Sequence, residues 1–287
     1  MSDPPRTAPD SAPTQPPDVD LSHPSAARAY DYYLGGNLNF AADREFAEEV
    51  LDRAPFVADF ARSNRAFLHR AVTWLCARGV DQFLDIGSGL PTVGNVHEIA
   101  EKANPRARTV YVDYEPVAVA RARTILDEVD PRRRRTGVFQ ADLRAPDQVL
   151  GADLLRETLD FSRPVALLIV ATMHFVGPGD GPEALLRRYW DALPGGSHVA
   201  LSHLTRDGVP DPVREQGEAL ERLYAATPNP GYFRDRAEFT ALFGDLELVE
   251  PGVVWAPEWH PEGQPPAAAS ESATLVGVAR KPADGNP

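Results

Sequence analysis

The chain has 287 residues, of which 43% are hydrophobic and 25% are charged, and its formal net charge is −13 with a pI near 5.0. This length suits one large domain or a domain with an added cap, and the acidic balance argues against a general surface that binds nucleic acids. The single cysteine, Cys76, excludes a disulfide framework and a cysteine-rich zinc site and fits a reducing compartment. The sequence shows no secretory signal or membrane-length apolar run, so we expect a cytoplasmic protein without a membrane partner.

The first part of the chain is predicted to be a tail followed by a helical cap. Residues 1–22 are rich in Pro, Ser, Thr and Asp and are expected to be a disordered tail, and residues 282–287 a loose end. Residues 23–80 are expected to form the cap, with helices at 26–34, at 43–51 and from 64 to the glycine at 79.

Three tyrosines, Tyr30, Tyr32 and Tyr33, stand immediately before the glycine pair Gly35-Gly36. Two interpretations remain open for this cluster. The rings pack beside a glycine that ends the helix, or they belong to a mobile cap and face a ligand.

From residue 81 to residue 281 strands and helices alternate. Strands are expected at 83–86, 109–112, 137–140, 165–171 and 198–204, and helices at 93–102, 116–129, 147–157 and 183–193. Two further helices, near 211–226 and 235–243, precede two last strands at 246–254 and 273–279. Such alternation predicts an α/β fold with a mostly parallel sheet and helices on both faces.

A glycine loop follows the first strand, in the stretch Gln82-Phe83-Leu84-Asp85-Ile86-Gly87-Ser88-Gly89-Leu90-Pro91. A helix is expected to start after it, near Thr92 or Val93. A plain turn from strand to helix would also fit this pattern. Asp85, however, is an acid on a buried apolar strand, which is costly without a partner. It would repel a pyrophosphate and would suit a cationic ligand such as S-adenosylmethionine.

Polar residues follow several of the predicted strands. Asp85, Asp113, Asp142 and His174 each stand where a strand ends. Because ligands of open α/β sheets bind outside the carboxyl ends of the strands, we expect these side chains to share one rim. The acids lack an accompanying histidine cluster, so no metal site is predicted.

These stretches resemble the class I S-adenosylmethionine-dependent methyltransferases, and more narrowly an actinobacterial group of S-adenosyl methyltransferases formerly catalogued as a domain of unknown function. The resemblance covers nearly all of residues 23–281. It is carried by Ala29-Tyr30-Asp31-Tyr32-Tyr33-Leu34-Gly35-Gly36, the glycine-loop stretch, Val110-Tyr111-Val112-Asp113 and Gly195-Gly196-Ser197-His198 with Ser202-His203. It implies a Rossmann-like sheet of seven strands, with the last strand inserted antiparallel beside the fifth. It also implies a role in secondary metabolism by analogy.

The resemblance also implies roles for individual residues. The methionine end of the cofactor would be held by Asp85, Gly87, Ser88 and Gly89, the ribose by Asp113, and the adenine by Tyr114, Asp142 and Leu143. Pro91 departs from the family pattern because it stands where a third loop glycine is usual. That departure leaves the path of the loop open.

His174 is the candidate catalytic base, since it follows the fourth strand on the side where a methyl group would be transferred. Local hydrogen bonding is the other interpretation for His174, and His203 shares this ambiguity. The predicted function is S-adenosylmethionine-dependent methyl transfer to a small-molecule acceptor. Two alternatives are a non-catalytic protein that binds this cofactor and a nicotinamide-dependent oxidoreductase, against which Asp85 argues. The sequence leaves the acceptor and the oligomeric state open.

Overall fold

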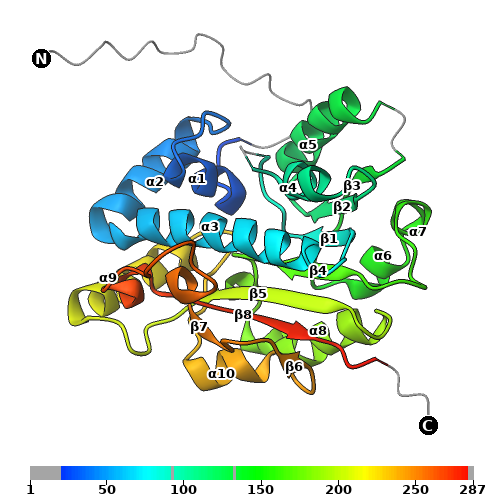
Figure 1. The fold of residues 1–287 in the computed structure, drawn as a ribbon. Helices are drawn as coiled ribbons and strands as arrows, with labels where there is room; N and C mark the ends of the chain where they lie inside the picture. The colour runs from blue at the N-terminus through cyan, green and yellow to red at the C-terminus, as the bar shows by residue number, and fades with distance from the viewer. Residues whose placement is uncertain (1–20, 92–93, 132–133, 284–287) are drawn as a thin grey trace, which may run out of the picture.

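A computed structural model describes residues 21–91, 94–131 and 134–283. The predicted tails therefore lie almost entirely outside the described residues. In the described part the strands are β1 (Gln82–Ile86), β2 (Arg108–Asp113), β3 (Thr136–Gln140), β4 (Ala166–Ile169), β5 (His198–Leu204), β6 (Glu247–Leu248), β7 (Val254–Trp255) and β8 (Thr274–Arg280). They form one sheet in the order β3-β2-β1-β4-β5-β8-β6, and β7 also pairs with β8 (Figure 1).

Strands β1 to β5 run parallel, and β8 lies antiparallel beside β5, which confirms the predicted sheet. The strand predicted over 246–254 is instead two short strands, β6 and β7, that both pair with β8. Pro251 cannot donate a ladder hydrogen bond, and Gly252 turns the chain with φ +81°, so the segment cannot pair continuously. Because β1 lies between β2 and β4, the connections diverge at the carboxyl end of β1.

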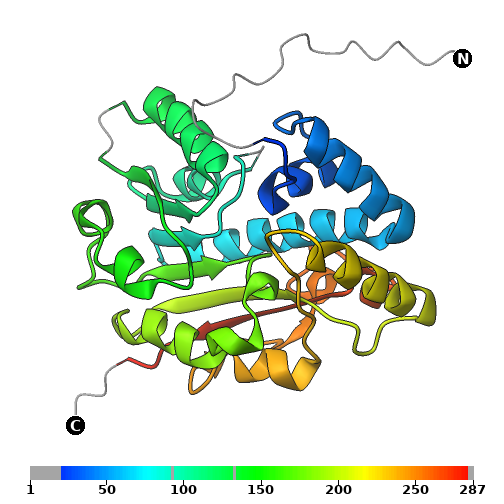
Figure 2. The same ribbon diagram turned by 180° about the vertical axis from the view of Figure 1, so that it is seen from behind.

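Helices cover both faces of the sheet (Figures 1 and 2). One face packs against α3 (Phe56–Cys76), α4 (Val96–Ala103) and α5 (Pro116–Val129). The other face packs against α6 (Pro146–Leu150), α7 (Asp153–Thr158), α8 (Pro182–Asp191) and α10 (Arg236–Ala241). Strand β1 shows the alternation that makes this possible, because Phe83 faces the first group of helices while Leu84 and Ile86 face the second.

A third group of helices lies beyond the carboxyl ends of the strands. It consists of α1 (Ala26–Tyr33), α2 (Ala41–Arg53), the first half of α3, and α9 (Asp211–Ala225). Because α3 packs on both this cluster and the sheet, it holds the two together. The division between a cap and a catalytic domain at residue 80 stays a prediction.

Two predicted helix starts were wrong. Helix α3 begins at Phe56, with Pro55 at its N-cap, and Val57 and Phe60 extend the buried face by two turns. Helix α4 begins at Val96, later than predicted, because Gly94 has φ +79° and cannot belong to a helix. Thr92 and Val93 lie outside the described residues. The predicted helix at 147–157 is divided into α6 and α7.

The remaining described helices are short 3₁₀ turns, η1 (Met173–Phe175), η2 (Pro178–Asp180), η3 (Ala256–Glu258) and η4 (Ala269–Ser272). Within the described ranges, no helix has both the length and the apolar character needed to cross a lipid bilayer.

Candidate active site

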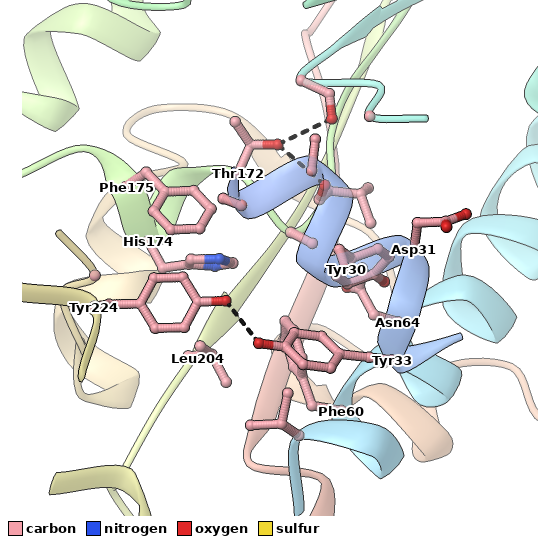
Figure 3. Close-up of a pocket in the computed structure, with 18 of the residues that line it drawn as sticks. Tyr30, Asp31, Tyr33, Phe60, Asn64, Thr172, His174, Phe175, Leu204 and Tyr224 are labelled. Carbon is pink, nitrogen blue, oxygen red and sulfur yellow. Dashed lines mark hydrogen bonds between the residues drawn. The ribbon is translucent and has the colours of Figure 1, made fainter. Parts of the chain in front are cut away.

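A cavity lies at the carboxyl ends of β1, β4 and β5 and is bounded on its far side by α1, α3 and α9 (Figure 3). Its lining has two parts. The glycine-loop half contains Arg65, Asp85, Gly87, Ser88, Gly89, Leu90, Asp113 and Tyr114. The aromatic half contains Tyr30, Tyr33, Phe60, Asn64, His174, Phe175, Leu204, Tyr224, Tyr232 and Phe233.

Two glycines of the loop are required for different reasons. Gly87 has φ +74°, and a Cβ at this position would lie 2.2 Å from Oγ1 of Thr172, which follows β4. The Thr172 hydroxyl lies within reach of the carbonyls of Gly87 and Val170, at 3.3 and 3.2 Å (Figure 3). Gly89 has φ +66° but faces open space. Position 87 therefore requires glycine because a Cβ would collide with the residue after β4 and because φ is positive. Position 89 favours glycine only because φ is positive.

Asp85 and Asp113 place two buried carboxyl groups at the ends of neighbouring strands. Burial raises the pKa of Asp85 to about 7; the Arg65 guanidinium opposes this shift and the Asp113 carboxylate adds to it. Burial also raises the pKa of Asp113 to about 6, although its oxygens accept hydrogen bonds from the backbone N–H groups of Gly89 (2.7 Å) and Glu115 (2.8 Å). A cation beside these groups would favour their ionised forms.

Of the three residues that were predicted to hold the adenine, one lines the cavity and two do not. Tyr114 lines the cavity, is exposed, and donates a hydrogen bond from its hydroxyl to Oδ1 of Asn229 at 2.6 Å. Among the described residues, Asp142 and Leu143 do not line the cavity. They follow β3, which lies beyond β2 and so one strand further from the carboxyl end of β1, where the chain connections diverge. Although burial opposes it, hydrogen bonding to Arg144 at 2.7 Å lowers the pKa of Asp142. The roles of Asp142 and Leu143 stay predictions.

His174 lines the aromatic half from the η1 turn, and its ring points toward α1 (Figure 3). The imidazole packs against Phe60 and Phe175, with ring centroids 5.9 and 4.3 Å away. Its Nδ1 atom is buried without a hydrogen-bond partner among the described residues. Burial and the nearby Arg234 charge lower the pKa of His174 to about 3, so the ring is neutral at physiological pH.

A buried arginine, which the sequence analysis missed, supports this turn. Arg234 donates hydrogen bonds to the carbonyls of Met173 (3.0 Å) and Val176 (2.7 Å), on either side of His174. It also donates to Nε2 of His203 at 2.6 Å, which leaves the His203 proton on Nδ1, directed at the Leu204 carbonyl. His203 is thus fully engaged beneath the turn and is not among the described lining residues.

The tyrosine cluster packs beside the end of α1, and two of its three rings also line the cavity. Gly35 ends α1 with φ +77°, and a Cβ on Gly36 would lie 2.0 Å from Oδ1 of Asp31. Tyr30 and Tyr33 nevertheless line the cavity, whereas the Tyr32 hydroxyl bonds Glu48 on the surface. The hydroxyl of Tyr33 lies 3.1 Å from that of Tyr224 and joins α1 to α9 (Figure 3).

The sequence analysis also missed Asn64, which is 1% exposed and lines the cavity. A signal for it was present. Asn64 lies four residues after Phe60 and four before Leu68, so it is a polar residue on the apolar face of α3.

The polar groups of the glycine-loop half fit S-adenosylmethionine. Asp85 offers a buried carboxyl group to the cationic methionine end, and the Asp113 carboxylate can accept from a ribose diol. Open space beside Gly89 allows a ligand to approach the backbone closely. Among the described residues, no group of three or more His, Cys, Asp or Glu side chains is arranged to hold a metal ion.

Comparison with known proteins agrees with this geometry. The family model described as S-adenosyl methyltransferase matches residues 12–282. The fold is similar to the crystal structure of a candidate methyltransferase from Thermobifida fusca YX, with a TM-score of 0.85 and 39% identity over 93% of this chain and 98% of that chain. It is also similar to a DUF574 family protein from Streptomyces avermitilis MA-4680, with a TM-score of 0.83 and 37% identity over 92% and 99% of the two chains.

A more distant similarity is to magnesium protoporphyrin IX methyltransferase from Synechocystis PCC 6803 with bound SAH, at a TM-score of 0.51 and 14% identity over 88% and 92% of the two chains. That likeness concerns the fold alone. No curated protein matched the sequence. The family match over almost the whole chain, together with the two close structures, makes S-adenosylmethionine the cofactor and methyl transfer the activity. The chain belongs to the S-adenosyl methyltransferase family.

Proposed function

We propose that this methyltransferase acts on a small-molecule acceptor that binds in the aromatic half of the cavity. The observation that carries the proposal is the continuity of the cavity. One space is lined at one end by Asp85 and Asp113 and at the other by aromatic rings and His174. Small-molecule sites have this composition, mostly apolar walls with a few placed polar groups.

We further propose the residues that hold the cofactor. Asp85, Gly87, Ser88 and Gly89 hold its methionine end, Asp113 accepts from the ribose hydroxyls, and Tyr114 packs on the adenine. Asp142 and Leu143 complete the adenine end. The first six of these line the cavity, which supports their assignment.

The bound cofactor supplies a methyl group on positively charged sulfur, so the protein has chiefly to align the acceptor and exclude water. His174 is proposed to receive the acceptor's reacting hydrogen-bonding group and to act as its base. A neutral ring with an unpaired, buried Nδ1 supports this role. Its low pKa restricts it to an acceptor whose proton is readily lost.

A cytoplasmic location and a place in secondary metabolism remain part of the proposal. Burial and the Asp81 charge raise the pKa of the half-buried Cys76 thiol to about 11 and keep it protonated.

Calorimetry with S-adenosylmethionine and S-adenosylhomocysteine (SAH), followed by a radiolabelled methyl-transfer screen against small molecules, tests the proposal. We expect Asp113→Ala to abolish the binding of both compounds. His174→Ala should keep SAH binding and lose transfer. Asp59→Ala, at an exposed position of α3, is the matched control and should change neither. Unaltered SAH affinity in Asp113→Ala would contradict the assigned cofactor site.

A further inference from the structure

The aromatic half of the cavity has a more specific composition than a general apolar pocket. Its rings form a chain of contacts, Tyr30 to Phe60 (centroids 6.2 Å apart), Phe60 to His174 (5.9 Å) and His174 to Phe175 (4.3 Å), with Tyr224 beyond at 5.9 Å from Phe175. The first two contacts are edge-to-face. These rings come from α1, α3, η1 and α9, so they surround the space on several sides.

The hydrogen bonds of Tyr30 determine how the Asn64 amide is oriented. The Tyr30 hydroxyl donates its proton to the carbonyl of Ala61 at 3.1 Å, so toward Asn64 it can act only as an acceptor. The group of Asn64 at 3.1 Å from this hydroxyl is therefore the amide nitrogen, Nδ2. This leaves Oδ1 of Asn64 buried and without a partner among the described residues.

A buried carbonyl oxygen without a donor is unfavourable, and a ligand that brings an O–H or N–H group removes that cost. The Nδ1 atom of His174 is a second buried polar atom of this half without a partner in the described structure. Glu221, a charged lining residue on this side, is engaged with Arg206 at 3.3 Å. The unsatisfied polar groups are thus neutral and stand among rings.

From this arrangement we propose that the acceptor is a planar aromatic compound whose ring packs against the aromatic half. A hydroxyl group of this compound, distinct from the reacting group that His174 receives, donates to Oδ1 of Asn64. Asn64 is then the residue that selects acceptors with a hydrogen-bond donor. The inference rests on the proposed function, because it takes the glycine-loop half as the place of the cofactor.

The test is calorimetric binding to the full chain saturated with SAH, with three probes of one skeleton. 2-Naphthol is planar and donates, 2-methoxynaphthalene is planar and only accepts, and decahydro-2-naphthol donates but is not planar. We expect 2-naphthol to bind at least about tenfold more tightly than either of the others. 2-Methoxynaphthalene leaves the Oδ1 acceptor of Asn64 unmatched, which costs about that factor, and decahydro-2-naphthol loses the contacts of a planar ring with the aromatic half.

Two variants identify the residue responsible. In Asn64→Leu, the affinity for 2-naphthol should fall to that for 2-methoxynaphthalene, which itself should not change. Tyr30→Phe keeps the ring but removes the hydroxyl that orients the amide. The amide can then turn its N–H₂ group to the ligand, and discrimination between the two planar probes should diminish.

Equal affinities of the wild-type protein for the three probes, with SAH bound normally, would overturn the inference and leave the proposed function standing. Full discrimination retained in both variants would overturn the role of Asn64. Failure of SAH to bind in the same experiment would instead count against the proposed function. Because the wild-type comparison needs no variant, the test does not depend on the folding of Asn64→Leu.

Discussion

Nη1 of Arg234 lies 2.6 Å from Nε2 of His203, so a buried cation and a buried imidazole meet directly beneath the turn that presents His174. The same guanidinium donates to the carbonyls of Met173 and Val176, which flank His174 along the chain. The charged guanidinium therefore donates hydrogen bonds to three neutral acceptors, and the planar arrangement of its N–H groups matches their positions. Arg234 thereby holds the backbone on either side of His174, and we expect it to position that ring.

Two substitutions of Arg234 test its contribution to stability and its contribution to catalysis separately. Arg234→Met leaves three buried acceptors unsatisfied and should lower the free energy of unfolding by roughly 3 kcal/mol. Arg234→Lys keeps the charge but cannot reach all three acceptors, so we expect a smaller loss of stability and a lower kcat. Denaturant unfolding measures the first effect, and steady-state kinetics with calorimetry measures the second. SAH affinity should stay unchanged in Arg234→Lys, and an unchanged kcat would argue against positioning.

The two loop glycines offer a matched pair of substitutions. Gly87→Ala would bring a Cβ to 2.2 Å from Oγ1 of Thr172, whereas Gly89→Ala meets no atom within 4 Å. Both positions have positive φ, so each alanine costs about 1–2 kcal/mol in backbone conformation. Only Gly87→Ala adds a steric clash. We expect the larger loss of unfolding free energy for Gly87→Ala, measured by thermal and chemical denaturation, and equal losses would show that the loop yields at Thr172.

Cofactor affinity should depend on pH through Asp85. Its folded-state pKa is raised to about 7, so the carboxyl group is increasingly protonated as the pH falls through that value. A cationic ligand favours the carboxylate, so binding is strongest above about pH 7 and weakens below it. For one such group the affinity for S-adenosylmethionine should fall about tenfold between roughly pH 8 and pH 6.

Calorimetry across this range checks the dependence, and Asp85→Asn should flatten it. Asp113, with a pKa of about 6, adds a further decrease at the acidic end. His174 contributes nothing here because its pKa of about 3 lies below the range. A profile that is equally steep in Asp85→Asn would assign the titration to another group.

Arg28 joins α1 to the start of α5 through a buried ion-pair network. Its guanidinium contacts Asp43 at 2.7 Å and Glu115 at 3.1 Å, and Glu115 is the N-cap of α5, two residues after Asp113. Arg28→Met removes the positive charge from two buried carboxylates and should lower the free energy of unfolding by about 3–5 kcal/mol.

The exposed pair of Arg62 and Asp59, 2.6 Å apart, provides the control. Arg62→Met should cost less than about 0.5 kcal/mol, because solvent screens that pair. Urea unfolding of the two variants beside the wild type makes the comparison. Similar losses in both would mean that the network around Arg28 contributes no more than a surface contact.

Much of this fold is encoded locally. Strand β5 has the predicted bounds, and α5 starts at Pro116 as predicted, because apolar runs and a proline at a helix start are signals within a few residues. The strand pattern alone predicted that Asp85, Asp113, Asp142 and His174 share one rim, since parallel strands end on the same side, and all of these except Asp142 line the cavity. The sequence by itself thus determined the parallel part of the sheet and the position of two acids, Asp85 and Asp113, in the glycine-loop half of the cavity.

The aromatic half was decided only by the tertiary structure. Tyr33 and Tyr224 are 191 residues apart in the sequence, and Arg234 lies 31 residues from His203, so no local pattern relates either pair. The starts of α3 and α4 were also missed. Tertiary packing of Val57 and Phe60 extends α3 to Phe56, and the positive φ of Gly94 delays the start of α4. Hydrogen bonds and ring contacts between distant segments exist only after the chain has closed its loops around the sheet, and the aromatic half of the cavity is made of such contacts.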